Sequence, residues 1–183
     1  MDHPTPAPII EGMDLYSFIR DVPDFPKPGI VFKDITPMLA DPAALRASID
    51  QMAERVRAHD VERIVGIESR GFIFGVPIAA QLGIGFTPVR KPRKLPWKTR
   101  SVEYDLEYGK DTLEIHEDGV EHGQRVAIVD DLLATGGTAK AATILVQGLG
   151  AVIAGCFFAV ELGFLKGREK LADHHCDALV HFG

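Results

Sequence analysis

The sequence predicts an α/β fold, in which helices flank a mainly parallel sheet. Strand-like and helix-like segments alternate along the chain, and this order favours parallel strands joined by helices on both faces. The strand-like segments are unbroken apolar runs, which is typical of strands buried on both faces. At 183 residues, with 46% hydrophobic and 25% charged residues, the chain fits one globular domain with a full core. Ligands of such folds bind beyond the carboxyl ends of the strands.

The first part of the chain contains few regular patterns. A short helix is expected around residues 14–20. Residues 23–37 contain four prolines and are expected to form an extended loop, with a short strand at 30–32. Asp41-Pro42 then marks a helix start, because Asp favours the N-cap and Pro the first helical position. Apolar residues at helical spacing follow it: Leu45, Ile49, Met52, Ala53 and Val56.

The rest of the chain carries the alternating pattern. Between residues 101 and 116, apolar and polar residues alternate around a turn at Gly109-Lys110, which predicts a β-hairpin. The expected helices are residues 71–82, 137–147 and 165–171, and the expected strands are residues 63–67, 85–89, 125–130, 152–160 and 178–182.

Charge indicates the kind of ligand. A net charge of −6 argues against binding to nucleic acid, because a polyanion would be repelled. Residues 90–100 nevertheless hold six basic residues and no acidic one. This segment indicates a local site for a strongly anionic ligand, and a solvated basic loop is the alternative.

Other features restrict the class of protein. No apolar run approaches the roughly 20 residues that cross a bilayer, and residues 1–8 lack the pattern of a secretory signal. We therefore expect a cytoplasmic protein without a membrane partner, with a flexible tail at 1–12 and a single domain at 13–183. Cys156 and Cys176 do not make a disulfide framework, and no redox or zinc role is expected for them.

One segment carries the strongest chemical signal. A predicted strand ends in two acids, Asp130 and Asp131, and small residues then lead into a helix: Ala134, Thr135, Gly136, Gly137 and Thr138. Small residues let backbone N–H groups surround a phosphate, and the helix N-terminus adds its positive dipole end. The carboxylates can accept hydrogen bonds from sugar hydroxyls and help to hold Mg²⁺. The segment therefore predicts a site for a ribose phosphate.

Other interpretations of these motifs are weaker. The segment could be an ordinary strand-to-helix turn, but neither a P-loop nor a G-x-G-x-x-G pattern is present. Ser69 lies in G-x-x-S-x-G, one residue away from the spacing of a serine-hydrolase nucleophile. His174-His175-Cys176 offers adjacent metal ligands, and without a second cluster such ligands seldom complete a tetrahedral site.

Residues 129–138, VDDLLATGGT, resemble the motif with which type I phosphoribosyltransferases bind 5-phosphoribosyl 1-diphosphate (PRPP), and they are most similar to adenine phosphoribosyltransferases. The resemblance covers about residues 13–172. It implies the type I phosphoribosyltransferase fold, with a small N-terminal hood at about 20–37 and a flexible β-hairpin catalytic lid at about 91–116. The segments that carry it are residues 24–37, 68–75, 90–96, 106–118 and 161–171.

The resemblance also implies roles for single residues. Residues 134–138 would hold the 5-phosphate, and Asp130 with Asp131 the ribose hydroxyls, with possible help to a Mg²⁺ ion held mainly by PRPP. The diphosphate would be bound by Arg70, Arg90 and Lys91, since arginine forks suit its oxygens. A cis peptide bond is implied at Glu68-Ser69.

The purine site follows from the same resemblance. Glu107 would be the catalytic acid or base that exchanges a proton with the purine. Adenine would lie between Phe32 and Leu132, with backbone groups of Val31 and Lys33 at its edge. Lys33 stands where many members of the family carry Arg, which matters little if only its backbone contacts the base.

The implied reaction belongs to purine salvage: PRPP and adenine give AMP and diphosphate, with Mg²⁺ as cofactor and a homodimer as the assembly. A sister enzyme for xanthine, hypoxanthine or guanine is one alternative. A PRPP-sensing regulator is another, although such a regulator would need an added DNA-binding domain.

Overall fold

The structure is a computed structural model that describes residues 12–105 and 109–183. The chain divides into two compact units, one ending at Gln51 and the other comprising Met52–Gly183. Each unit is described by itself.

The first unit contains a two-stranded antiparallel hairpin. Its strands pair with Arg20 opposite Asp34 and Pro23 opposite Val31. A 3₁₀ turn precedes the hairpin, and the Asp14 carboxylate accepts a hydrogen bond from the N–H of Tyr16 at 3.0 Å at its start. The elements are η1 (Leu15–Phe18), β1 (Arg20–Pro23), β2 (Val31–Asp34), α1 (Thr36–Ala40) and the greater part of α2 (Pro42–Arg57).

Two expectations for this unit were wrong in part. The segment 14–20 forms a 3₁₀ turn and the start of β1 instead of a helix, and residues 36 and 37, expected at the end of an extended loop, begin the short helix α1 (Thr36–Ala40). Pro37 lies in the first turn of α1, where the N–H that proline lacks has no partner in any case. The start of α2 is confirmed, because the Asp41 carboxylate accepts hydrogen bonds from the N–H groups of Ala43 and Ala44, both at 2.9 Å.

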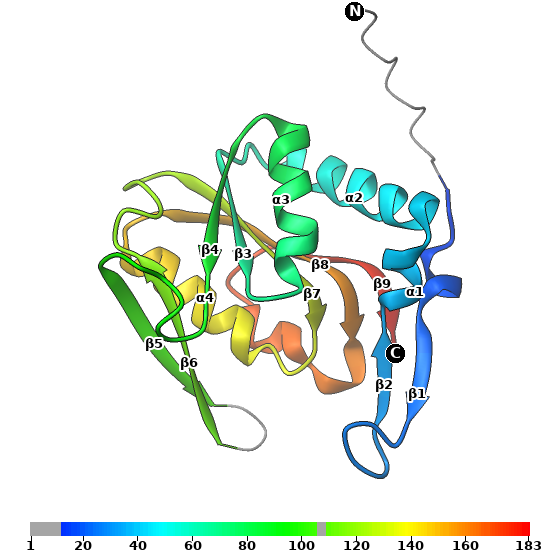
Figure 1. Cartoon of the computed structure of the whole chain (residues 1–183). Helices are drawn as coiled ribbons and strands as arrows, with labels where there is room; N and C mark the ends of the chain where they lie inside the picture. The colour runs from blue at the N-terminus through cyan, green and yellow to red at the C-terminus, as the bar shows by residue number, and fades with distance from the viewer. Residues whose placement is uncertain (1–11, 106–108) are drawn as a thin grey trace, which may run out of the picture. The chain divides into compact units, whose positions relative to one another are not determined.

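The second unit is built on a five-stranded sheet in the order β4-β3-β7-β8-β9, with every neighbouring pair parallel (Figure 1). This arrangement confirms the predicted fold class. The strands are β3 (Arg63–Ile67), β4 (Gly85–Val89), β7 (Arg125–Leu133), β8 (Val152–Leu162) and β9 (Cys176–Phe182), and the helices are α3 (Gly71–Leu82) and α4 (Gly137–Gly148).

The two helices cover opposite faces of the sheet. Val65, Ile128 and Phe158 pack into one buried cluster with the apolar side of α4. On the other face, α3 approaches so closely that a Cβ on Gly75 would lie 3.4 Å from Ile64. Successive residues of a strand point to opposite faces, and because helices cover both faces at the centre of the sheet, β3 and most of β7 and β8 can be apolar on both faces.

The end of the chain differs from the prediction. The expected helix at 165–171 is two 3₁₀ turns, η2 (Gly163–Leu165) and η3 (Gly167–Leu171). Lys166 separates them with a left-handed backbone, φ +56°. β7 and β8 also extend beyond their expected ends, so that Asp130 and Asp131 lie within β7.

The predicted hairpin at 101–116 is confirmed as β5 (Thr99–Asp105) and β6 (Lys110–His116), which pair in antiparallel register (Figure 1). The peptide bonds Glu68-Ser69 and Phe25-Pro26 are cis, and the first of these was expected.

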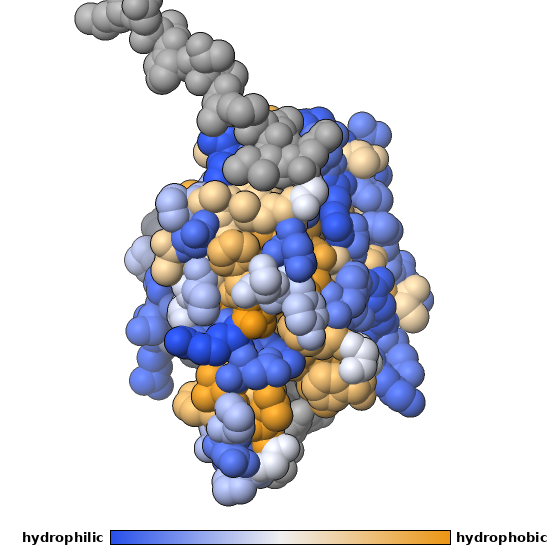
Figure 2. Space-filling view, turned by 90° about the vertical axis from the view of Figure 1, so that its right-hand side faces the viewer, coloured by the Kyte–Doolittle hydropathy of each residue, from blue (hydrophilic) through white to orange (hydrophobic). Residues whose placement is uncertain are grey.

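Among residues 12–105 and 109–183, none of the helices has the length and apolar character needed to span a membrane. The face in Figure 2 carries hydrophobic patches among hydrophilic residues.

Candidate functional site

A pocket of about 310 Å³ lies where β3, β4 and β7 end in the second unit. Its volume is at the small end of the range for ligand pockets in proteins. Most of its lining is polar or consists of small residues. The lining residues are Glu68, Ser69, Arg70, Lys91, Asp130, Asp131, Leu132, Leu133, Ala134, Thr135, Gly136, Gly137, Thr138 and Ala139.

One wall of the pocket is the loop that leads into α4. Gly136 forms the N-cap of this helix with φ +77°, a left-handed conformation that glycine adopts without strain. As glycine, Gly136 offers the first N–H groups of the helix no side-chain cap, which leaves them suited to bind a ligand. These N–H groups and the helix dipole make the loop suited to a phosphate.

The floor of the pocket is acidic. Asp130 and Asp131 are both buried, and the N–H of Asp131 donates a hydrogen bond to Asp130 Oδ1 at 2.9 Å. Burial, followed by the neighbouring charge of Asp131, raises the pKa of Asp130 well above its usual range. A carboxyl so placed gains from any ligand that brings positive charge or hydroxyl donors.

Two neighbours hold this floor in place. Arg70 Nε donates to Asp131 Oδ2, which pairs the first basic residue of the pocket with the second acid. Gly71 begins α3 directly beside the floor, where a Cβ would lie 2.8 Å from Asp130 Oδ1 and from the Val129 carbonyl oxygen. A glycine at this position lets α3 start close enough to position Arg70.

A second ion pair lies at the edge of the pocket. Glu68 accepts two hydrogen bonds from the Arg90 guanidinium, at 2.8 and 3.2 Å, and one from the N–H of Lys91 at 3.0 Å. The hydrogen bonds from Arg90 hold the pKa of Glu68 below its usual range, although burial opposes them. The pair joins the residues after β3 to those after β4.

Lys91 itself points to the hairpin. Its Nζ donates to Tyr104 Oη at 3.1 Å and forms an ion pair with Asp111. Burial lowers the pKa of Lys91, but the hydrogen bonds to Asp111 and Tyr104 outweigh burial, and the net direction is upward. Thr138 Oγ1 lies 3.5 Å from the same Tyr104 oxygen. Tyr104 therefore bridges the basic side of the pocket and the start of α4.

Most of the predicted site residues of the second unit come together in this pocket. Arg90 is the exception, because it lies beside the pocket and its guanidinium is bonded to Glu68 and to the Lys94 carbonyl oxygen. Glu107 lies outside the described residues. Sequence reasoning missed the partners Glu68, Tyr104 and Asp111, although the alternation at 101–116 had placed Tyr104 in the hairpin.

Of the residues expected to contact a base, Leu132 lines the pocket of the second unit, and Val31, Phe32 and Lys33 lie in the hairpin of the first unit. The rings of Phe25 and Phe32 pack edge to face, with centroids 5.2 Å apart. Lys33 Nζ forms an ion pair with Asp21 at 2.6 Å. The side chain of Lys33 is thus engaged within the hairpin, while its backbone remains the group expected at the base.

The donors of the pocket fit a metal ion that arrives with its substrate. Among the residues that the structure describes, no group of three or more His, Cys, Asp or Glu side chains could hold a metal. Asp130 and Asp131 supply two carboxylates. Mg²⁺ in phosphate-transfer sites is commonly held by one or two carboxylates together with substrate phosphates, and this donor set matches that pattern.

Taken together, the pocket offers backbone donors for one phosphate, carboxylates for sugar hydroxyls, and cations for a second anionic group.

Comparison with known proteins agrees with a site for a phosphorylated sugar. The family model described as a phosphoribosyl transferase domain matches residues 36–179. An adenine phosphoribosyltransferase from Acaryochloris marina is 57% identical over 170 residues, which cover 93% of this chain and 100% of the relative.

Solved structures give the same result. The crystal structure of adenine phosphoribosyltransferase from Thermoanaerobacter pseudethanolicus has a TM-score of 0.89 and 52% identity, covering 92% of this chain and 98% of that chain. The enzyme from Saccharomyces cerevisiae, solved in complex with an imino-altritol bisphosphate and adenine, has a TM-score of 0.84 and 41% identity, covering 90% and 96%.

Proposed function

Because this chain belongs to the phosphoribosyltransferase family, in the group of adenine phosphoribosyltransferases, we propose that it transfers the 5-phosphoribosyl group of PRPP to N9 of adenine. The products are AMP and diphosphate, and the role is purine salvage. The observation that carries the proposal is the pocket in which two buried carboxylates adjoin a phosphate-binding helix start.

The ribose 5-phosphate half of PRPP occupies the loop and the floor. Residues 134–138 bind the 5-phosphate through backbone N–H groups and the hydroxyls of Thr135 and Thr138. Asp130 and Asp131 accept hydrogen bonds from the ribose hydroxyls. The loop and the acidic floor line the same pocket, and this supports the assignment.

The diphosphate half is bound by the basic residues. Arg70, Arg90 and Lys91 each have a carboxylate partner in the free protein: Asp131, Glu68 and Asp111. These carboxylates orient the three cations before the ligand arrives. When the diphosphate binds, it either replaces the carboxylate as the partner of each cation or becomes a second anionic partner. Such preorganised charge stabilises the negative charge that develops on the leaving diphosphate.

The reaction forms a bond between N9 of adenine and C1 of the ribose, while the bond from C1 to the diphosphate oxygen breaks and its electron pair leaves with that oxygen. The sugar becomes oxocarbenium-like as the leaving group departs. Asp130 and Asp131 would help to hold a Mg²⁺ ion bound mainly by PRPP, and the ion would supply charge neutralisation at the diphosphate. Glu107 accepts the proton that adenine loses as N9 bonds to C1, and the segment 91–116 acts as a lid that excludes water.

The proposed contacts of adenine are the ring of Phe32, the side chain of Leu132 and backbone groups of Val31 and Lys33. Stacking on Phe32 holds any purine, and hydrogen bonds that distinguish a 6-amino from a 6-oxo group give selectivity. The edge-to-face packing of Phe32 on Phe25 supports this role, because it fixes the ring for stacking.

We also propose that the assembly is a homodimer, as the family resemblance implies, and that the compartment is the cytoplasm.

A substrate panel tests the function. The purified protein is supplied with PRPP, Mg²⁺ and one base at a time, and nucleotide formation is measured for adenine, hypoxanthine, guanine and xanthine. We expect AMP, and a kcat/KM for adenine about 100-fold or more above that for hypoxanthine. Equal rates with hypoxanthine would favour the sister enzyme, and PRPP binding without turnover of any base would favour the regulator.

Lys91→Met is expected to raise the KM for PRPP about tenfold, because a charge-assisted hydrogen bond contributes about 1.5–3 kcal/mol. Lys98→Met is the matched control, since it removes the same charge from the same basic segment but does not line the pocket. Steady-state kinetics at fixed salt compares the two variants. An equal rise in the KM for PRPP in both variants would mean that the basic segment at 90–100 acts only through its overall charge.

A further inference from the structure

The phosphate-binding loop rests on a turn of the chain that lies far from it in sequence. A Cβ on Gly136 would lie under 3.0 Å from the carbonyl oxygen of Gly167, and a Cβ on Gly167 would lie as close to the carbonyl oxygen of Ala134. The N–H nitrogen of Gly136 is only 3.1 Å from that second Cβ position. Neither glycine has room for a side chain, so the two backbones are in direct contact.

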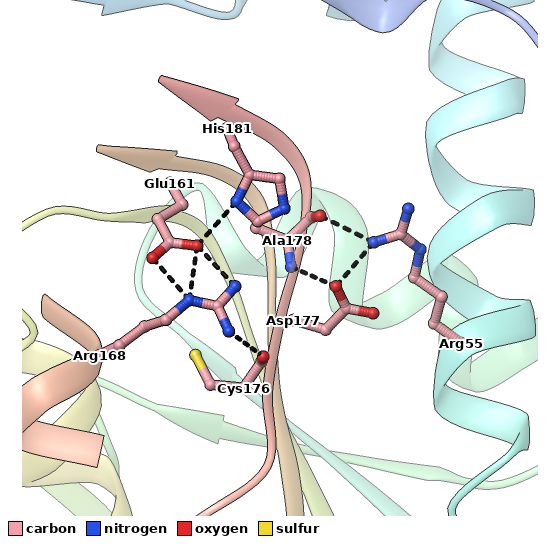
Figure 3. A network of polar contacts seen from close by, with 7 residues as sticks. All are labelled: Arg55, Glu161, Arg168, Cys176, Asp177, Ala178 and His181. Atoms are coloured by element: carbon pink, nitrogen blue, oxygen red, sulfur yellow. Dashed lines mark hydrogen bonds and ion pairs between the residues drawn. The ribbon is translucent and has the colours of Figure 1, made fainter. Parts of the chain in front are cut away.

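The residue next to Gly167 is held by a buried carboxylate. Arg168 Nε donates to Glu161 Oε1 and Oε2 at 2.7 and 2.8 Å, and Arg168 Nη2 donates to Oε2 at 2.6 Å (Figure 3). The remaining terminal nitrogen donates to the carbonyl oxygen of Cys176 on β9. The side chain of Glu161 is only 7% exposed, and His181 Nδ1 lies 2.9 Å from its Oε2.

The ion pair closes a short loop of chain. Glu161 is near the end of β8, and the chain then passes through η2 and the left-handed Lys166 to reach Gly167 and Arg168. The hydrogen bonds from Arg168 hold the pKa of Glu161 below its usual range, so the pair is charged at neutral pH. Fixing both ends of this loop fixes the position of Gly167.

We propose that Glu161 and Arg168 are positioning residues for binding of the 5-phosphate: they hold Gly167 against Ala134 and Gly136 and so keep the N–H groups of the phosphate loop aligned. The proposal rests on the proposed function, since it assigns the 5-phosphate to residues 134–138. A preorganised set of donors binds an anion without the cost of ordering the loop, and the pair thereby strengthens binding without touching the ligand.

The structure supplies a matched control in the same region. Arg55, from α2, reaches β9 from the other side and donates to Asp177 Oδ1 at 2.8 Å and to the Ala178 carbonyl oxygen at 2.7 Å (Figure 3). Like Arg168, it joins a carboxylate and a backbone carbonyl oxygen of β9. Its contacts do not include the turn at Gly167. Arg55→Leu therefore removes similar bonds without affecting the support of the loop.

The test compares two ligands on folded protein by titration calorimetry: ribose 5-phosphate, which needs the loop, and inorganic diphosphate, which does not. Wild-type protein and Arg55→Leu are expected to bind both ligands alike. Arg168→Leu should bind ribose 5-phosphate about tenfold more weakly and diphosphate within about twofold of wild type. Backbone N–H groups of residues 135–138 should exchange with solvent faster in Arg168→Leu than in Arg55→Leu.

Gly167→Ala provides a second variant if Arg168→Leu does not fold. Its Cβ meets the loop directly, and it should show the same selective loss. Gly148→Ala is its control, because a Cβ there has nothing within 4 Å. Unchanged affinity for ribose 5-phosphate, or an equal loss of both ligands, would overturn the positioning role and leave the proposed function standing. A wild-type protein that binds no ribose 5-phosphate would overturn both.

Discussion

Asp130→Asn is expected to make the free protein more stable and the enzyme much less active. Asparagine has the same shape, and its Oδ1 can still accept the hydrogen bond from the N–H of Asp131. The substitution replaces a carboxyl, whose ionised form burial and Asp131 both disfavour, with a side chain that stays neutral. We expect the Tm to rise by about 2–4 °C, as about 1 kcal/mol would give in a chain of this size. Loss of charge-assisted hydrogen bonds to the ribose should lower kcat/KM for PRPP about 100-fold.

The gain in stability should depend on pH. An Asp carboxyl in an unfolded chain has a pKa of about 3.9. Above that pH the unfolded chain ionises Asp130 while the folded chain, whose pKa is raised, keeps the proton. Unfolding then releases a proton, and the stability of the wild type falls as pH rises toward the folded pKa. The advantage of Asp130→Asn over wild type should therefore grow with pH above about 4 and then level off.

Asp177→Asn serves as the control for this prediction. Asp177, on β9, pairs with Arg55 of α2 and does not line the pocket. The same chemical change there should lower stability slightly and leave the kinetics unchanged. Thermal unfolding at several pH values and steady-state kinetics measure both variants. An Asp130→Asn variant no more stable than wild type would show that Asp130 does not destabilise the free protein. A variant with full activity would show that Asp130 is not a ligand of the ribose.

Gly136→Ala is expected to lower activity about as much as Asp130→Asn does, but for a different reason. The backbone at Gly136 has φ +77°, which costs an alanine about 1–2 kcal/mol. The added Cβ would also meet the Gly167 carbonyl oxygen and displace the loop. Because a displacement of about 1 Å can cost 100-fold in rate, kcat/KM for PRPP should fall about 100-fold.

Gly83→Ala separates the cost of a left-handed alanine from the effect of the Cβ contact with Gly167. Gly83 also has a left-handed backbone, φ +69°, but a Cβ there has nothing within 4 Å. Gly83→Ala should lose about 1–2 kcal/mol of stability, as expected for the backbone of Gly136→Ala, and should keep the kinetics of the wild type. Denaturant unfolding and PRPP kinetics of both variants make the comparison. Full activity in Gly136→Ala would show that the loop does not need its present backbone to bind the 5-phosphate.

The fold was predictable where apolar runs and capping residues marked the elements. β3, β4 and α3 begin and end at the expected residues, with Gly83 closing α3 in the left-handed conformation. Prediction failed at α1, where proline content suggested an extended loop, and at 14–20, where a 3₁₀ turn and the start of β1 replace the expected helix. It also failed at 165–171, where the left-handed Lys166 divides the expected helix into two 3₁₀ turns.

The site was predictable where its residues are contiguous. Residues 130–138 could be recognised because the acids, the small residues and the helix start follow one another in sequence. The supporting ion pairs could not be recognised, because Glu68 and Arg90, or Lys91 and Asp111, meet only when separate strands are assembled. The contact of Gly136 with Gly167 left no sequence pattern either, since it involves backbone atoms alone.

A crystal structure of the protein with PRPP and Mg²⁺ tests the central claim most directly. We expect the 5-phosphate oxygens within about 3 Å of backbone nitrogens of residues 135–138. The ribose hydroxyls should contact the carboxylates of Asp130 and Asp131, and the diphosphate should lie toward Arg70 and Lys91. A 5-phosphate bound at the basic residues instead, or PRPP bound outside the pocket, would contradict the account.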